Sequence, residues 1–265
     1  MLIIGEKINS SSRKVAEAIR KRDSQFILGL ARKQKEAGAD FIDVNAGTLM
    51  EKEKESMEWL VRTIQEALEV PLSIDSPNPE VLRRGLELHK GKAFLNSLTG
   101  EKDRMESVLP LILEFRPLII ALCMDEGGIP TQAEERLLIA QKITETLTSQ
   151  GVAEEEIFFD PIIRPVGAEP EAGKVALETI ALIKEKIPRV KTICGLSNIS
   201  FGLPIRGLLN SVFLALAMGK GLDGAILDPT DKRIQEVLIA SGVLTAEDPY
   251  SLNYIRAYRE GRIGP

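Results

Sequence analysis

The residues best suited to chemistry in this sequence are polar side chains that end a series of short apolar runs. They are Glu6, Lys7, Asn9, Asp43, Asn45, Asp75, Asn96, Asp125, Asp160, Ser197, Asn198 and Asp228. Asp43 and Asn45 lie two residues apart in one run, so both side chains point to the same side of a strand. Carboxylates and amides gathered at one mouth suit a heterocycle rich in N–H donors and ring nitrogens, such as a pterin or a purine. The same carboxylates also suit Mg²⁺, so this pattern alone leaves both ligands open.

Aspartate and asparagine also cap helices, which gives these residues a purely structural alternative. Asp228 precedes the sequence PTDK, which is typical of a helix start, so we expect a capping role there. Capping explains Asp43, Asn45 and Asn96 less well, because they still follow the strand pattern. For these three residues the sequence favours a ligand.

The remaining side chains exclude several kinds of catalysis. The chain has one His and two Cys, which excludes the usual zinc site. We expect His89 to lie near the negative end of a helix dipole. Cys123 and Cys194 lie far apart in apolar segments, so we expect them to be buried and inert. Catalysis must therefore rest mainly on Asp, Glu, Asn, Lys, Arg or a bound cofactor.

Charge and hydropathy exclude further classes of protein. The formal net charge is -5, so the chain has no basic surplus for nucleic acid. Apolar runs such as LPLILEF and PLIIALCM fall well short of the roughly 18 residues that a membrane span needs. The N-terminus lacks the pattern of a signal peptide. We therefore expect a cytoplasmic protein with neither nucleic acid nor membrane as a partner.

The elements that must position the polar residues repeat about every 30 residues. Eight apolar, partly β-branched runs predict strands that begin at Leu2, Asp40, Pro71, Lys92, Pro117, Glu156, Val190 and Gly224. Amphipathic stretches between them predict helices, with apolar stripes over residues 57–68, 138–147 and 175–187. Pro110 is expected to kink or interrupt the fourth helical stretch.

Eight such units without an internal boundary predict one α/β domain over residues 1–265, folded as a (β/α)8 TIM barrel. The alternative is an open, doubly wound sheet, but neither GxGxxG nor GxxxxGK occurs in the chain. In both folds the ligand binds at the carboxyl ends of the strands.

Eight motifs follow one another in a specific order along the chain. They are GEKIN from Gly5, FIDVNAG from Phe41, SIDS from Ser73, FLNS from Phe94, GGIP from Gly127, FFDPII from Phe158, GLSNISFGLPIRGLLN from Gly195 and GLDGAILDP from Gly221. Over essentially its whole length the chain resembles the methyltetrahydrofolate:corrinoid protein methyltransferases. These belong to the pterin-binding family with the folate module of cobalamin-dependent methionine synthase and, more distantly, dihydropteroate synthase. The resemblance implies an enzyme that moves a methyl group between N5 of (methyl)tetrahydrofolate and the cobalt of a corrinoid.

The resemblance also implies roles for individual residues. Asp75, Asn96 and Asp160 match residues that hydrogen-bond the pterin ring, and Asn198 matches the asparagine that contacts N5. Asn198 and Asp160 are the expected catalytic residues, because they can stabilise the positive charge that develops on N5. We expect the proton on N5 to be exchanged with solvent, since the sequence offers no obvious general acid.

Three further residues complete the expected folate site. Gly195 and Ser197 match neighbours that line the pterin pocket, and Arg206 matches an arginine placed to meet the aminobenzoyl-glutamate tail. No metal site is implied. The chain departs from some relatives that act on a corrinoid iron–sulfur protein, because Phe201 replaces an amide. That replacement favours O-demethylation or methylamine and betaine catabolism over acetyl-CoA synthesis.

The resemblance further implies two protein partners. The length of 265 residues leaves no room for a corrinoid-binding domain, so we expect a separate corrinoid protein to supply the corrinoid. A homodimer is also implied, and either the SVFLALAMG helix or the PYSLNYIRAYRE segment offers an apolar surface for it.

Three alternative functions remain. Dihydropteroate synthase shares the barrel, but its late histidine has no counterpart here, where the one histidine is His89. A Mg²⁺-dependent lyase or aldolase would use Asp43, Asp75, Asp160 and Asp228. A folate carrier would bind the pterin without turnover.

Overall fold

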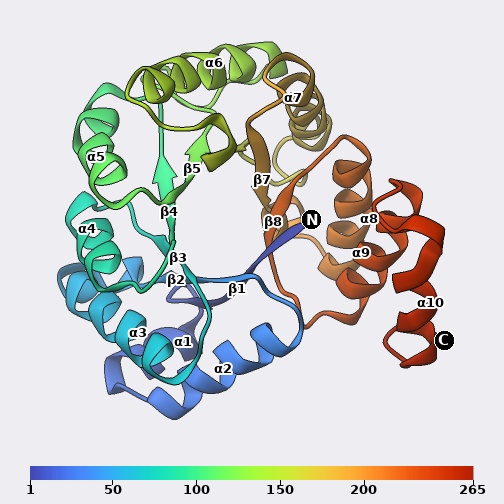
Figure 1. The fold of residues 1–265 in the computed structure, drawn as a ribbon, viewed down its shortest axis with the longest axis horizontal. Coiled ribbons are helices and arrows are strands. Elements are labelled where there is room, and N and C mark those ends of the chain that lie inside the picture. Colours follow the sequence, from blue (N-terminus) through green and yellow to red (C-terminus); the bar gives the residue numbers. More distant parts are fainter. Residues whose placement is uncertain (265) are drawn as a thin grey trace.

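A computed structural model describes residues 1–264 and contains a closed barrel of eight parallel strands (Figure 1). The strands are β1 (Leu2–Asn9), β2 (Phe41–Asn45), β3 (Leu72–Asp75), β4 (Phe94–Leu98), β5 (Leu118–Leu122), β6 (Ile157–Asp160), β7 (Lys191–Gly195) and β8 (Gly224–Leu227). Each strand pairs with the next in sequence, and β8 pairs with β1 to close the barrel. The predicted (β/α)8 barrel is confirmed, and the doubly wound alternative is wrong.

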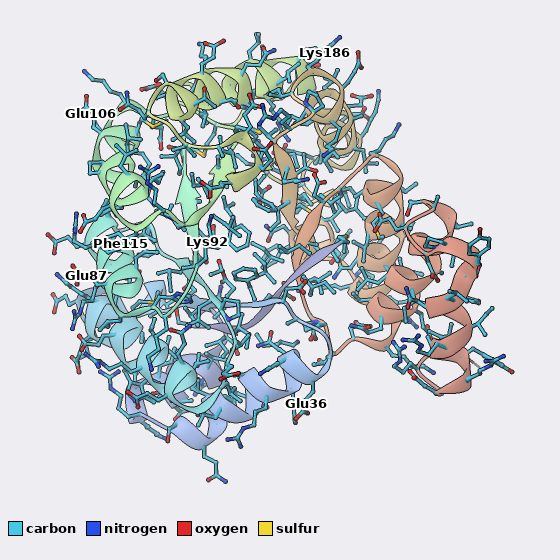
Figure 2. All side chains as sticks on the ribbon, viewed as in Figure 1. Glu36, Glu87, Lys92, Glu106, Phe115 and Lys186 are labelled. Carbon is cyan, nitrogen blue, oxygen red and sulfur yellow. The ribbon has the colours of Figure 1, made fainter. Side chains whose placement is uncertain are left out.

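Helices form a ring around the barrel (Figure 1). They are α1 (Arg13–Lys21), α2 (Ser24–Glu36), α3 (Glu53–Ala67), α4 (Pro79–Leu88), α5 (Lys102–Phe115), α6 (Ala133–Ser149), α7 (Ala172–Lys186), α8 (Arg206–Gly219), α9 (Lys232–Leu244) and α10 (Leu252–Arg259). Short 3-10 helices follow two strands, η1 (Gly47–Lys52) after β2 and η3 (Leu196–Ser200) after β7. Two others, η2 (Glu154–Glu156) and η4 (Pro249–Ser251), precede β6 and α10. Charged side chains such as Glu87, Glu106 and Lys186 lie on the outer rim (Figure 2).

The packing of the helices differs from the sequence prediction at two positions. Helix α5 continues through Pro110, so the predicted interruption is wrong. Pro110 and Glu106 lie on the exposed face, where water can hydrate the carbonyl that lacks its helical donor. Leu138 was expected in the apolar stripe of α6 but is 57% exposed, whereas Ile139 and Ile143 are buried.

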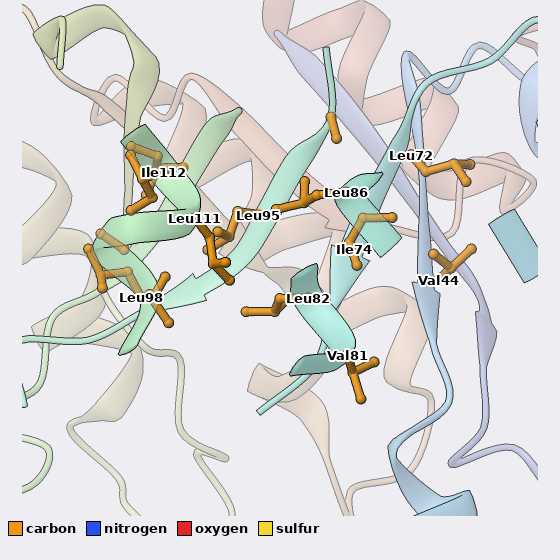
Figure 3. Packing of buried hydrophobic residues seen from close by; sticks show 14 of the residues in the cluster. Val44, Leu72, Ile74, Val81, Leu82, Leu86, Leu95, Leu98, Leu111 and Ile112 are labelled. Carbon is orange, nitrogen blue, oxygen red and sulfur yellow. The ribbon is translucent and has the colours of Figure 1, made fainter. Parts of the chain in front are cut away.

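The outer faces of the strands pack against the helices. Val44, Ile74 and Leu95 point outward from three neighbouring strands into an apolar layer shared with helices α4 and α5 (Figure 3). Gly85 of α4 lies so close to the sheet that a Cβ there would come within 2.5 Å of the Ile74 side chain. This close approach fixes α4 against β3.

The inner faces form an apolar floor inside the barrel. Ile4, Phe94 and Ile193 are fully buried there. The ring of Phe94 meets those of Phe41 and Phe158 edge to face, with centroids 4.8 and 4.9 Å apart. Strand side chains alternate between the two faces, so the next inward position lies one layer nearer the carboxyl ends. In most strands that next residue is polar, which places a polar layer directly above an apolar floor.

His89 and the two cysteines have structural positions. His89 follows α4 as its C-cap, and its Nε2 accepts a hydrogen bond from the Leu72 backbone N–H at 2.9 Å. Burial lowers the pKa of His89, so the neutral ring acts as an acceptor and the expected helix-dipole contact is secondary. Cys123 and Cys194 are buried as predicted, and burial raises the pKa of both thiols. Within residues 1–264, no helix is long and apolar enough to cross a membrane.

Candidate active site

A pocket of about 670 Å³ opens at the carboxyl ends of the strands. Six of the seven predicted folate-binding residues line it: Asp75, Asn96, Gly195, Ser197, Asn198 and Arg206. Asp160, the seventh, is not a lining residue. The barrel thus brings together residues that are more than a hundred positions apart in the sequence, as the strand-end pattern predicts.

Asp75 is held at the mouth by its neighbour on β2. The Asn45 Nδ2 donates a hydrogen bond to Asp75 Oδ2 at 2.8 Å. The side-chain oxygen of Asn45, Oδ1, accepts hydrogen bonds from the Ser10 hydroxyl and from the Gly47 N–H, which fixes the orientation of the side-chain amide. Within residues 1–264, Asp75 Oδ1 has no hydrogen-bond donor, so it is available to a ligand. Asn78 caps α4, so Asp75 is not the cap of that helix.

Asn96 is oriented in a similar way by a buried acid. Its Nδ2 donates to Asp43 Oδ1 at 3.2 Å, and the Ser73 hydroxyl donates to the same oxygen at 2.7 Å. Burial and the nearby charge of Asp75 raise the pKa of Asp43 well above its usual range, which favours the neutral acid. Asp43 and Asn45 therefore both face the barrel interior, as their spacing predicts. The amide oxygen of Asn96 is left for a ligand.

Asp160 ends β6 and is half-buried, although it is not among the residues that line the pocket. Its Oδ1 accepts the Ile162 backbone N–H at 2.7 Å, and the carboxylate also accepts a backbone bond from Gly195. Burial raises the pKa of Asp160 to about 6. A Cβ on Gly195 would lie 3.1 Å from Asn198 Nδ2, so the Asn198 amide rests directly against Gly195. Asp160 is thereby connected to Asn198 through one residue.

Asn198 lies on η3 and is exposed at the mouth of the pocket. Among the other residues in the described range 1–264, its side chain has no hydrogen-bond partner. Its amide can therefore turn to present either the oxygen or the NH₂ group to a ligand.

Glu6 is a site residue that the sequence analysis did not assign to the folate pocket. It lines the pocket, and the Ser197 hydroxyl lies 2.7 and 2.9 Å from its two oxygens. Burial raises the pKa of Glu6, although the Ser197 bond and the charge of Lys7 oppose the shift. The position of Glu6 in the GEKIN motif, at the end of the first strand, was its sequence signal.

The rest of the polar ring is divided among other tasks. Asp228 forms an ion pair with Lys7 at 2.5 Å and accepts bonds from the backbone and hydroxyl of Thr230. Asp231 caps α9, so the prediction that Asp228 is the cap is wrong. Asp125 accepts the Gly127 N–H in the loop after β5 and does not line the folate pocket.

Arg206 anchors the loop that contains Asn198. Its Nη2 donates to the Ser197 carbonyl at 2.6 Å, and its Nε donates to the Ser200 hydroxyl at 3.0 Å. The guanidinium also lies 5.9 Å from the centre of the Phe201 ring. Two of its five N–H groups bind the loop, and its contact with the aminobenzoyl-glutamate tail stays a prediction.

One wall of the pocket was not predicted. It consists of α1 and α2, which both lie between β1 and β2 and contribute Lys14, Val15, Phe26 and Leu30. Amphipathic helices are common in barrels, so the sequence carries no signal that separates this pair from the others.

The four carboxylates of the Mg²⁺ alternative are not assembled into one ligand set. Asp43 binds Asn96, Asp75 binds Asn45, and Asp160 binds two backbone N–H groups. Asp228 pairs with Lys7. Within residues 1–264, no group of three or more His, Cys, Asp or Glu side chains has the geometry to hold a metal ion.

Fold and pocket together define a pterin-binding barrel, and sequence comparison gives the same class. The model of the pterin binding enzyme family matches residues 5–228. The chain is 38% identical to methylcorrinoid:tetrahydrofolate methyltransferase of Eubacterium limosum, over 100% of this chain and 98% of that protein. It is 32% identical to methionine synthase of Mycobacterium tuberculosis over 86% of this chain, which is 20% of the longer protein.

Solved structures share the fold at lower sequence identity. Dihydropteroate synthase of Clostridium difficile has a TM-score of 0.70 and 15% identity, over 92% of this chain and 96% of that chain. The Yersinia pestis enzyme has a TM-score of 0.69 and 13% identity, over 93% of both chains. This likeness shows the barrel fold alone.

The chain therefore belongs to the pterin binding enzyme family. Within it, the chain is a full-length homologue of a methylcorrinoid:tetrahydrofolate methyltransferase. The resemblance inferred from the eight motifs is confirmed.

Proposed function

We propose that this protein transfers a methyl group between N5 of tetrahydrofolate and the cobalt of a corrinoid bound to a separate protein. The observation that carries the proposal is the 38% identity to a methylcorrinoid:tetrahydrofolate methyltransferase over the whole chain. The lining of the pocket supports it, because Asp75 and Asn96 each leave an acceptor oxygen for the N–H groups of a pterin.

The chemistry requires stabilisation of a positive charge on N5. A neutral tertiary amine is a poor leaving group, so N5 must carry positive charge when its bond to the methyl group breaks. In the reverse direction, N5 becomes cationic as it accepts the methyl group. Asn198 can turn its amide oxygen toward this charge or toward an N5 proton, and Asp160 is connected to it through Gly195.

The corrinoid supplies the nucleophilic cobalt or the methyl–cobalt bond. Asn198 lies at the open mouth of the pocket, so N5 next to Asn198 would face a partner docked over the barrel. Phe201, which is 66% exposed, lies at the same rim and offers an apolar contact to that partner. The pathway that Phe201 favours and the cytoplasmic location stay predictions; growth-substrate dependence and cell fractionation would test them.

We also propose that the protein is a homodimer through the outer face of α8. Leu208, Leu209, Val212 and Leu216 on this helix are 37–53% exposed and form an apolar face. The helix also borders an apolar groove of about 480 Å³ shared with α7. Exposed apolar faces of this kind mark protein interfaces.

An anaerobic methyl-transfer assay tests the enzymatic function. The protein is mixed with Co(I) cobalamin and methyltetrahydrofolate, and the visible spectrum reports formation of methyl-Co(III). Asn198→Ala should lower the transfer rate by on the order of 10²-fold with a smaller effect on folate affinity, as expected for a transition-state contact. An unchanged rate in the variant would remove the role of Asn198. Absence of transfer to free cobalamin and to every corrinoid protein tested would refute the function.

A further inference from the structure

Glu6 is the acid in the pocket that the proposed chemistry leaves without a task. Its side chain extends from β1 into the polar layer, one inward position above the buried Ile4. It lines the same pocket as Asn198, so it lies within the cavity that the folate ring would fill.

Ser197 connects Glu6 to the reacting position. Its hydroxyl is within hydrogen-bond distance of both Glu6 oxygens, at 2.7 and 2.9 Å, and the next residue in the chain is Asn198. Ser197 also lines the pocket, and Arg206 holds its backbone carbonyl at 2.6 Å. A hydroxyl that donates to Glu6 keeps its lone pairs for an N–H of the ligand.

We propose that Ser197 and Glu6 form a proton relay that accepts the N5 proton of tetrahydrofolate during methylation and returns it in the reverse reaction. This inference rests on the proposed function. It replaces direct exchange with solvent, which the sequence alone suggested.

Protons and electron pairs can be followed through each step of the transfer. When the N5 lone pair attacks the methyl group of a methylcorrinoid, the carbon–cobalt electrons stay on cobalt and N5 becomes a cation that still bears its hydrogen. The N5–H bond then breaks in favour of a new bond to Ser197 Oγ, while the original Oγ–H proton passes to a Glu6 oxygen. N5 becomes a neutral tertiary amine and Glu6 a neutral acid. Every step reverses when methyltetrahydrofolate donates its methyl group.

The charges that face Glu6 support this task. Lys7 on the same strand and Arg206 on α8 favour the carboxylate, whereas Asp228 beyond β8 disfavours it. Asp43 on β2 also interacts with Glu6. The cationic neighbours are partly neutralised, because Lys7 pairs with Asp228. Burial then dominates and moves the pKa of Glu6 upward, toward the range in which a carboxyl group exchanges protons efficiently near neutral pH.

The other buried acids are less suited to this relay. Asp160 accepts two backbone N–H groups, and Asp75 accepts the Asn45 amide. Asp43 lies deeper, bound to Asn96 and Ser73. Glu6 differs from Asp43 because its hydroxyl partner, Ser197, itself lines the pocket, so this hydroxyl can exchange a proton with the ligand.

Glu6→Gln is the first test, because the amide keeps an acceptor for Ser197 and removes the titrating carboxyl group. Single-turnover methyl transfer is followed in both directions across pH with a saturating corrinoid. In the wild-type protein, transfer to tetrahydrofolate should rise with pH through the Glu6 titration, and transfer from methyltetrahydrofolate should fall through it. Glu6→Gln should lower both rates by roughly 10²-fold and abolish this titration, while the titration of the substrate amine remains. Folate affinity should change by less than about threefold.

Two further variants separate the relay from a structural role. Ser197→Ala should give the same loss of rate although Glu6 is retained. This variant tests the relay even if Glu6→Gln does not fold. Asp228→Asn should shift the Glu6 titration to lower pH, because it removes a negative charge and releases Lys7.

Each outcome is decisive. If Glu6→Gln transfers the methyl group at the wild-type rate and with the wild-type pH profile, the relay is overturned and the methyltransferase function stays intact. An equal loss of rate at all pH values, with the titration retained, would reduce Glu6 to a structural residue. A wild-type protein that transfers no methyl group would refute the function, and with it the relay.

Discussion

Folate binding should weaken in acid because two buried carboxylates must be ionised to accept the pterin N–H groups. Burial raises the pKa of Asp160 and of Asp75, each to about 6. A carboxyl group with a raised pKa takes up its proton as the pH falls through that value, and a protonated acid is a weaker acceptor. The folate affinity should therefore reach its maximum above about pH 7 and should decline below about pH 6.

The size of the effect follows from the ionised fraction. One unit below its pKa, at about pH 5, a carboxyl group is ionised in roughly one tenth of molecules, so each required carboxylate weakens binding about tenfold, or ~1.4 kcal/mol. Two such groups predict a loss of about 10²-fold at about pH 5. Asp160→Asn removes one of the two titrating carboxyl groups, so the folate affinity of this variant should fall only about tenfold between about pH 7 and about pH 5.

Anaerobic calorimetric titration with methyltetrahydrofolate measures these affinities directly. The titration of the ligand itself is common to both proteins and cancels in the ratio of their affinities. Asp125→Asn is the matched control, because Asp125 is an acid in a loop outside the pocket. A wild-type affinity that stays constant between about pH 7 and about pH 5, or that falls equally in Asp160→Asn, would refute the reasoning.

Two remaining predictions concern the floor of the pocket and the outer face of α8. Phe94→Ala should lower the free energy of unfolding by about 3–5 kcal/mol, since the ring is fully buried between Phe41 and Phe158; a loss below about 1 kcal/mol in urea denaturation would contradict its role as the floor. Val212→Glu should convert the dimer to a monomer in light scattering, whereas Leu138→Glu, at a similarly exposed position on α6, should not. A monomeric wild-type protein would remove the dimer proposal.

The barrel was predictable from the sequence because strand alternation is a local property. The spacing of Asp43 and Asn45 predicts that both side chains lie on one side of the strand, and the register of the parallel strands places Asp75 and Asn96 level with Asn45. The hydrogen bond from Asn45 to Asp75 joins residues paired on adjacent strands, whereas Asn96 on β4 reaches past β3 to Asp43, which lies one inward position lower on β2. The sequence therefore predicts those site residues whose placement depends only on the two-residue alternation of side chains along a strand.

Other features depend on distances that the period does not determine. Asp160 ends a strand like the others, but its side chain accepts a backbone bond from the following loop and is not among the residues that line the pocket. Asp228 was predicted to be a helix cap, and the presence of Lys7 across the β8–β1 closure could not be read from the local sequence. Pro110 and Leu138 were misjudged because solvent exposure depends on what packs against a helix.

A site without histidine suits this chemistry because the reacting group needs the field of nearby anions. Asp75 lines the pocket and the half-buried Asp160 lies next to Gly195 of its lining, whereas Lys7 is paired with Asp228. Ionised carboxylates in a poorly solvated pocket favour a cation on N5 more strongly than they would in water. The cationic amine occurs in both directions of methyl transfer, so one arrangement of fixed negative charge serves both. The same burial that makes these anions effective raises their pKa values, and the acid side of the activity profile should therefore fall where the carboxylates begin to protonate.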